Sequence, residues 1–202
     1  MIKIEVKGIK EVQAKLDRMR RDMQAKVLQP AINKVAAKAM AEINRAIPQE
    51  YAVKASEVRN AVTLRRAQAG RLEAVIEVFG SARKKGRSLN LIHFLAAVQG
   101  AGRAQAVRGK KVKKADLKSL DNQLGFIIKK MGGIKKIERA FVGNKGRTIF
   151  ARTGDARLPI QPLQVIGFSQ MFASRKISRR IMDKIAAEFP VEIDRALARL
   201  LA

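Results

Sequence analysis

Near the C-terminus of the chain, apolar side chains recur at every fourth position: Ile177, Ile181, Ile185, Phe189, Ile193 and Leu197. Because this spacing is close to the helical repeat of 3.6 residues, it predicts an amphipathic α-helix with one apolar face. Pro190 interrupts the run, and we expect it either to kink this helix or to lie near the first turn of a new one. Most of the apolar face must contribute to the domain's own core, and a subunit interface is the alternative use for the rest.

The N-terminal part carries two further helical patterns. Apolar side chains between Ile9 and Met23 are spaced alternately by three and four residues, which predicts an amphipathic helix there. The alanine-rich segment 32–47 predicts a second helix, because alanine favours the helical backbone. We expect Pro30 to break, kink or restart the helix between these patterns and Pro48 to end the second one.

The remaining residues show the alternating pattern of strands and the proline and glycine signals of turns. Strands are expected at 2–7, 62–66 and 72–79 and in a hairpin within 140–153, and residues 158–163 are expected to be extended because their prolines disfavour a helix. A short helix is expected at 54–61 and another is possible within 115–137, whereas the apolar segment 90–98 is of undetermined type. This order predicts one α+β domain over residues 1–202, in which N-terminal helices and a C-terminal helix pack on an antiparallel sheet.

The charge of the chain constrains its partners. Lysine and arginine number 43 and aspartate and glutamate 17, so the formal charge is +26. A free monomer of this size would repel itself and collect anions, so the expected partner is a polyanion or an assembly that contains one. Residues 78–115 contain no acidic residue and carry +10, and their glycines predict long basic loops. The candidate DNA-facing or partner-facing residues are Arg83, Lys84, Lys85, Arg87, Arg103, Arg108, Lys110, Lys111, Lys113 and Lys114.

Such basic runs can neutralise phosphates without reading sequence, and the alternative is a solvated face that only keeps the protein soluble. Specific base reading has little support, because the chain lacks tryptophan and shows neither a zinc finger nor an aromatic RNA-binding motif. Phe126, Phe141 and Phe150 lie near basic residues, but each also fits a core position, and we expect them to be buried.

Several classes of protein and site are not expected. The chain has no cysteine and one histidine, His93, so no disulfide framework, zinc cluster or HExxH motif is present. Gly100-Ala101-Gly102 begins like a nucleotide-binding loop, but Gln105 stands at the third glycine position. No set of carboxylates converges, so we expect no catalytic residue, no metal site and no bound cofactor. No signal peptide or membrane span is evident, so we expect the protein to be used in a cytoplasm or built into a particle assembled there.

Five segments, in order, are similar to the phage minor tail protein Z family, the tail completion proteins of long-tailed phages. They are Ile4–Ile9, Ala31–Ala36, Arg139–Val142, Leu158–Ile160 and Phe189–Ile193. The likeness covers most of the chain except about residues 100–137, which look like a basic insertion. The chain departs from the family where a Gly-Pro step is usual, because Gly167 there is not followed by proline.

The resemblance implies a structural, non-enzymatic role in the virion. It implies a homo-oligomeric ring, a hexamer, at the head-proximal end of the tail, next to the tail terminator, the tail tube and the head–tail connector. Genomic DNA would pass through the lumen, which would explain the basic composition. The alternative is a stand-alone protein that binds nucleic acid without sequence preference. An enzyme such as a nuclease would need a carboxylate cluster for its metal, and the sequence shows none.

Overall fold

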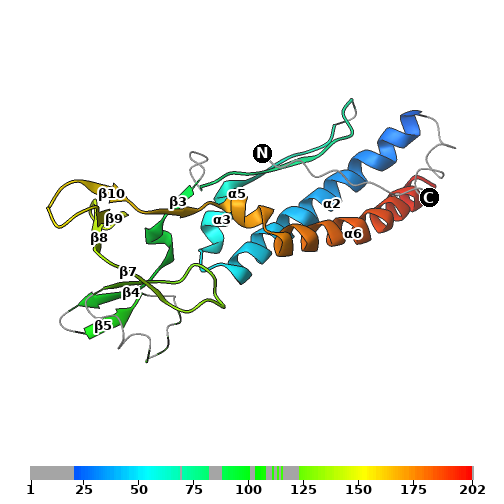
Figure 1. Cartoon of the computed structure of the whole chain (residues 1–202). Helices are drawn as coiled ribbons and strands as arrows, with labels where there is room; N and C mark the ends of the chain where they lie inside the picture. The colour runs from blue at the N-terminus through cyan, green and yellow to red at the C-terminus, as the bar shows by residue number, and fades with distance from the viewer. Residues whose placement is uncertain are drawn as a thin grey trace.

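The computed structural model describes residues 21–68, 70–81, 88–100, 103–107, 111, 113, 115 and 123–201. Two long helices, α2 (Arg21–Glu50) and α6 (Arg175–Leu201), lie side by side and antiparallel at one end of an elongated molecule. Small antiparallel sheets form the other end (Figure 1), so the α+β class predicted from the sequence is confirmed. Across the described residues, no helix is both long enough and apolar enough to cross a bilayer.

The segments described between α2 and α6 include two short helices, a 3-10 turn and the strands. The helices are α3 (Ala55–Ala61) and α5 (Phe168–Ala173), and the turn is η1 (Leu91–Phe94). Two of the described sheets have two strands each: β1 (Val62–Arg65) pairs with β2 (Val75–Val78), and β3 (Ser88–Asn90) pairs with β11 (Gln164–Ile166). A three-stranded sheet has the order β10 (Ile160–Pro162), β9 (Thr148–Arg152), β8 (Ala140–Gly143). A four-stranded sheet has the order β5 (Arg103–Ala106), β4 (Leu95–Gly100), β6 (Leu124–Phe126), β7 (Lys135–Ile137). The antiparallel strands are therefore divided among several small sheets.

The helix pair buries the apolar stripe that the C-terminal sequence predicts. Ile177, Ile181, Ile185 and Ile193 are buried, and Phe189 and Leu197 are half-buried beside them. At the outer end of the pair, Ile193 packs with Val27 and Ala31 of α2. Closer to the sheets, the stripe joins the main core. Removing this apolar surface from water holds the two helices together.

Proline does not interrupt either long helix. Residue 30 lies inside α2, residue 190 lies inside α6, and Pro48 precedes the last residue of α2 by two positions. The expected end at Pro48 is therefore wrong. A proline removes one backbone donor and costs about 3 kcal/mol in a helix interior. The extensive packing of α2 on α6 outweighs this cost. The strand expected at 2–7 and most of the helix expected after Ile9 lie outside the described residues.

The hairpin of β1 and β2 lies alongside α2 (Figure 1). Its position is set by Asn33, whose side chain accepts a hydrogen bond from the Ala67 backbone N–H at 2.8 Å and donates one to the Ala67 carbonyl at 3.1 Å. Gln29, one helical turn earlier, donates a second bond to the same carbonyl. Both strands and the helix α3 were predicted within one to three residues of their observed bounds.

The structure has two strands, β6 and β7, in the segment 115–137, where the sequence analysis allowed a short helix. Residues 124–126 form β6, whose three residues are all buried, and 135–137 form β7. The possible helix within 115–137 is therefore wrong for these residues, while 116–122 lie outside the described part. A short apolar run buried on both faces has no strand-like alternation, so periodicity cannot separate it from a buried helix.

Asn90 joins the sheets at the centre of the molecule. Its side-chain oxygen accepts hydrogen bonds from the backbone N–H groups of Ile149, at 2.8 Å, and Ile92, at 3.0 Å. Its amide nitrogen donates to the carbonyls of Leu163, at 3.0 Å, and Ile149, at 3.3 Å. One side chain thus connects β3, η1, β9 and the link between β10 and β11. The main core, which includes Phe94 and Phe168, lies next to this junction.

We predict that Asn90→Ala lowers the free energy of unfolding by about 2–3 kcal/mol, because it removes the acceptor of the backbone N–H groups of Ile149 and Ile92. Urea unfolding followed by circular dichroism measures the change. Asn60→Ala, at an exposed position of α3, is the matched control and should stay within about 0.5 kcal/mol of the wild type. Equal losses in the two variants would contradict the role assigned to Asn90.

Candidate assembly surfaces

The structure places few of the basic residues singled out in the sequence. Lys111 and Lys113 are exposed, and Arg103 opens β5. The others lie outside the described residues: Arg83, Lys84, Lys85, Arg87, Arg108, Lys110 and Lys114. Their orientation toward DNA or a partner stays a prediction.

The charge of the chain is unevenly distributed. Residues 78–162 carry twenty basic and four acidic side chains, which is +16 of the total of +26. Strands β4 to β10 belong to this segment and lie at the end of the molecule away from the helix pair, here called the sheet end (Figure 1). The other 117 residues share the remaining +10. Positive charge is therefore concentrated in this segment, whose described residues lie mostly at the sheet end.

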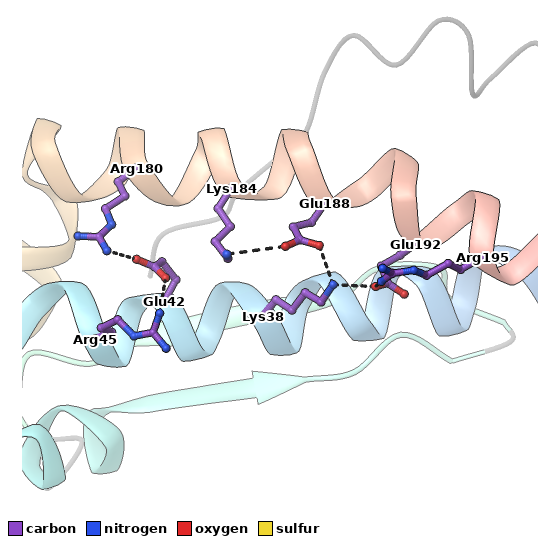
Figure 2. A network of polar contacts seen from close by, with 8 residues as sticks. All are labelled: Lys38, Glu42, Arg45, Arg180, Lys184, Glu188, Glu192 and Arg195. Atoms are coloured by element: carbon purple, nitrogen blue, oxygen red, sulfur yellow. Dashed lines mark hydrogen bonds and ion pairs between the residues drawn. The ribbon is translucent and has the colours of Figure 1, made fainter.

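On the helix pair, buried acids hold the basic side chains (Figure 2). Glu192 of α6 is 2% exposed, and its carboxylate lies 2.7 Å from Lys38 Nζ and 2.6 Å from the Arg195 guanidinium. Lys34 Nζ lies 3.7 Å from the other oxygen. The hydrogen bond from Lys38 is the main cause that lowers the pKa of Glu192 to about 2, and the Arg195 bond adds to it against the opposing effect of desolvation.

Lys38 also binds a second carboxylate, that of Glu188, at 2.6 Å. The hydrogen bonds to Glu188 and then Glu192 raise the pKa of Lys38, and the Lys38 bond lowers the pKa of Glu188. Lys184 lies 3.7 Å from Glu188 on the same helix. Figure 2 shows Lys38 of α2 reaching between two successive acids of α6. The ammonium group therefore ties the helices together.

A second buried acid repeats the arrangement one turn away on α2. Glu42 is 4% exposed, and its carboxylate lies 2.6 Å from the Arg180 guanidinium of α6 and 3.6 Å from that of Arg45 (Figure 2). Arg180 also donates to the Gln49 side chain, and Lys176 pairs with Glu50. These contacts neutralise much of the basic charge of the helix pair within the molecule. The burial of Glu42 and Glu192 was not predicted from the sequence.

The sheet end contains far fewer internal counterions. Residues 123–162 carry nine basic and two acidic side chains. Arg139 pairs with Asp155 at 2.6 Å, and that aspartate is 93% exposed. Six exposed cations have no carboxylate partner among the described residues: Lys129, Lys130, Lys135, Lys145, Arg147 and Arg157. This second basic region was not singled out in the sequence, although the excess of nine over two could have revealed it.

Two of the three phenylalanines expected in the core are not part of it. Phe126 is 1% exposed and belongs to the main core. Phe141 and Phe150 are half-buried, belong to none of the core clusters of the described residues, and stack on each other with ring centroids 6.0 Å apart. The expectation of core burial is therefore wrong for this pair.

Three side chains that could take part in acid–base chemistry each contact a polar neighbour. His93 Nδ1 lies 3.1 Å from Glu57, Glu77 pairs with Arg65, and Glu73 pairs with Arg71. Arg65 and Arg71 line a shallow hollow of about 310 Å³ beside the β1–β2 hairpin. In the part of the chain that the structure describes, histidine and acidic side chains form no group of three that could hold a metal ion.

Comparison with known proteins gives one match. The family model of prophage minor tail protein Z (GPZ) matches residues 6–202, nearly the whole chain. No curated protein and no solved structure matches the chain. The matched region includes residues 100–137, so the family pattern spans the segment that looked like an insertion.

The buried acids predict an acid-sensitive fold. Because the pKa of Glu192 falls from 4.5 to about 2 on folding, its stabilising contribution is complete above pH 4.5 and is lost as pH falls toward 2. We therefore expect Glu192→Gln to lower the free energy of unfolding at pH 7, with a difference from wild type that shrinks between pH 4.5 and 2. Urea titrations across this range measure it. Glu138→Gln, an exposed acid of the sheet end, is the control, and a pH-independent difference for Glu192→Gln would contradict the assignment.

Proposed function

Because the chain belongs to the prophage minor tail protein Z family, we propose that it completes the head-proximal end of a long phage tail as a subunit of a neck ring. Membership makes the chain a structural component of the phage tail and hence of the virion. The ring, taken as a homo-hexamer assembled in the host cytoplasm, its position at the neck and its contact with DNA are the proposed parts. Its role is to join tail to head, with no catalytic step.

The uneven charge carries this proposal. A subunit with +16 in its sheet-forming segment and +5 on its helix pair, where buried acids hold basic side chains, suits a ring that turns its basic side toward a polyanion. In a tail that polyanion is the genomic DNA in the lumen. Phosphate contacts of this kind are independent of sequence, as a bore that passes a whole genome requires.

Within this arrangement, we assign the DNA-facing or neighbour-facing role to the ten basic residues between Arg83 and Lys114. Lys111 and Lys113 are exposed, which such a role requires. The helix pair supplies the rigid body that holds the sheet end in place. The neighbouring rings would be the tail terminator, the tail tube and the head–tail connector. The chain acts as a single domain, and its basic segment at about 100–137 extends toward the DNA path.

The test uses tails assembled in cells that express the phage structural genes, with the chain supplied as full-length variants. We expect the wild-type chain to sediment with the tails and to be required for infectious particles. Recovery only as a free protein that binds DNA or RNA would favour a stand-alone nucleic-acid-binding protein and would sink the tail-completion proposal.

We predict that Lys110→Gln, Lys111→Gln, Lys113→Gln and Lys114→Gln together lower the yield of infectious particles roughly tenfold or more. In the purified protein, they should reduce the slope of log affinity for duplex DNA against log salt by about 3. The matched control neutralises four exposed cations of the helix pair, Lys26, Arg175, Arg179 and Arg199, with the same change in net charge. Equal effects of the two quadruple variants would show that total charge alone matters and would contradict the assigned DNA-facing residues.

A further inference from the structure

The sheet β10-β9-β8 has two different faces, and the strand register shows which residues share each. Phe141 is paired with Phe150, and Phe150 with Pro162, so these three side chains lie in one row across the sheet. Side chains alternate along a strand, so the next residue pair on the same face is Arg152 with Ile160. Ile149, one residue from Phe150, lies on the opposite face and is fully buried in the main core.

The face with the phenylalanines is exposed, although it is apolar. Ile160 is 38% exposed, Pro162 is exposed, and the two rings contact each other instead of the core. Gly143 leaves room for the Phe150 ring, because a Cβ atom there would lie 2.9 Å from that ring. The Arg152 guanidinium lies 4.9 Å from the centre of the Phe141 ring, where it completes the face. Apolar area of this kind, built around aromatic rings and an arginine, is typical of the centre of a protein interface.

Cations lie at both ends of this sheet. Lys145 and Arg147 lie at the β8–β9 turn, and Arg157 lies in the segment that leads to β10; all three are exposed and have no described carboxylate partner. Arg152 itself has none among the described residues. These residues form a positively charged rim of the face, and such a rim attracts a surface that carries aspartate and glutamate.

We propose that this outward face of the β10-β9-β8 sheet docks a different tail protein, through a surface with an apolar centre and an acidic rim. The proposal rests on the proposed function as a tail subunit and names the chemistry of one neighbour. A second copy bound through this same face is disfavoured, because it would bring Lys145, Arg147 and Arg152 against the same cations, so contacts between copies in the ring use other surfaces. Duplex DNA would pair with the rim, but its phosphates would leave the rings, Ile160 and Pro162 without an apolar complement.

The experiment places the photoreactive residue p-benzoylphenylalanine at position 160 of the full chain within assembled tails. Irradiation should cross-link the chain to another tail protein, at a segment that mass spectrometry identifies as rich in aspartate and glutamate. The same residue at position 182 of α6, where Met182 is also 38% exposed, is the control and should not give this product. Cross-links to a second copy or to DNA would overturn the proposal, as would no cross-link from position 160 in tails that contain the chain.

A charge reversal gives an independent readout. Arg152→Glu should reduce the amount of chain in tails roughly tenfold, whereas Arg179→Glu, the same change on an exposed position of α6, should not. Circular dichroism of the purified variants checks that both fold. Equal incorporation of the two variants would overturn the docking surface while leaving the tail role intact. Absence of the wild-type chain from tails would instead overturn the proposed function itself.

Discussion

Repulsion among 43 basic side chains is the constraint that this fold has to meet. The helix pair meets it by burying carboxylates where basic residues from both helices can reach them. Taking Glu42 and Glu192 out of water is costly, and the surrounding ammonium and guanidinium groups offset that cost. The lowered pKa of Glu192 reflects the same interaction. Removal of one partner would leave a buried charge unpaired, so the network fixes the register of α2 on α6 as well as holding the helices together.

Regular patterns made much of the fold predictable. The four-residue repeat of α6, the alternation of β1 and β2 and the glycine turn between β8 and β9 each depend on neighbours in the chain, and the structure confirms all three. Two features could not be predicted from such local signals. The strand β6 is buried on both faces and therefore shows no alternation, and Pro48 lies within α2 because packing against α6 outweighs the local preference. The small sheets are joined by Asn90, a single polar residue that makes four hydrogen bonds to Ile92, Ile149 and Leu163, and the last two lie far away in the sequence.

For the candidate sites too, features visible in neighbouring residues could be predicted, and contacts between distant residues could not. The acid-free run over 78–115 was visible as composition, and the family likeness was visible in the order of five short segments. The ion network was not, because Lys38 and Glu192 are 154 positions apart and nothing in the spacing of either one points to the other. The aromatic face was misjudged for a related reason. Phe141 and Phe150 alternate with Ile149 and Val142, so the pattern showed two faces but not which one the core would cover.

These differences between the two ends have a consequence for assembly. The helix pair contains its own counterions and its own apolar partners, so its stability depends on interactions inside the chain. The sheet end keeps its cations exposed and holds an aromatic pair outside the core. Anything acidic that covers this end relieves repulsion and buries apolar area at once, and binding to the folded chain stabilises it by mass action. Binding would therefore stabilise the sheet end, whereas contacts within the chain stabilise the helix pair. Such a subunit can fold before it binds its neighbours, and binding at the sheet end adds most to its stability.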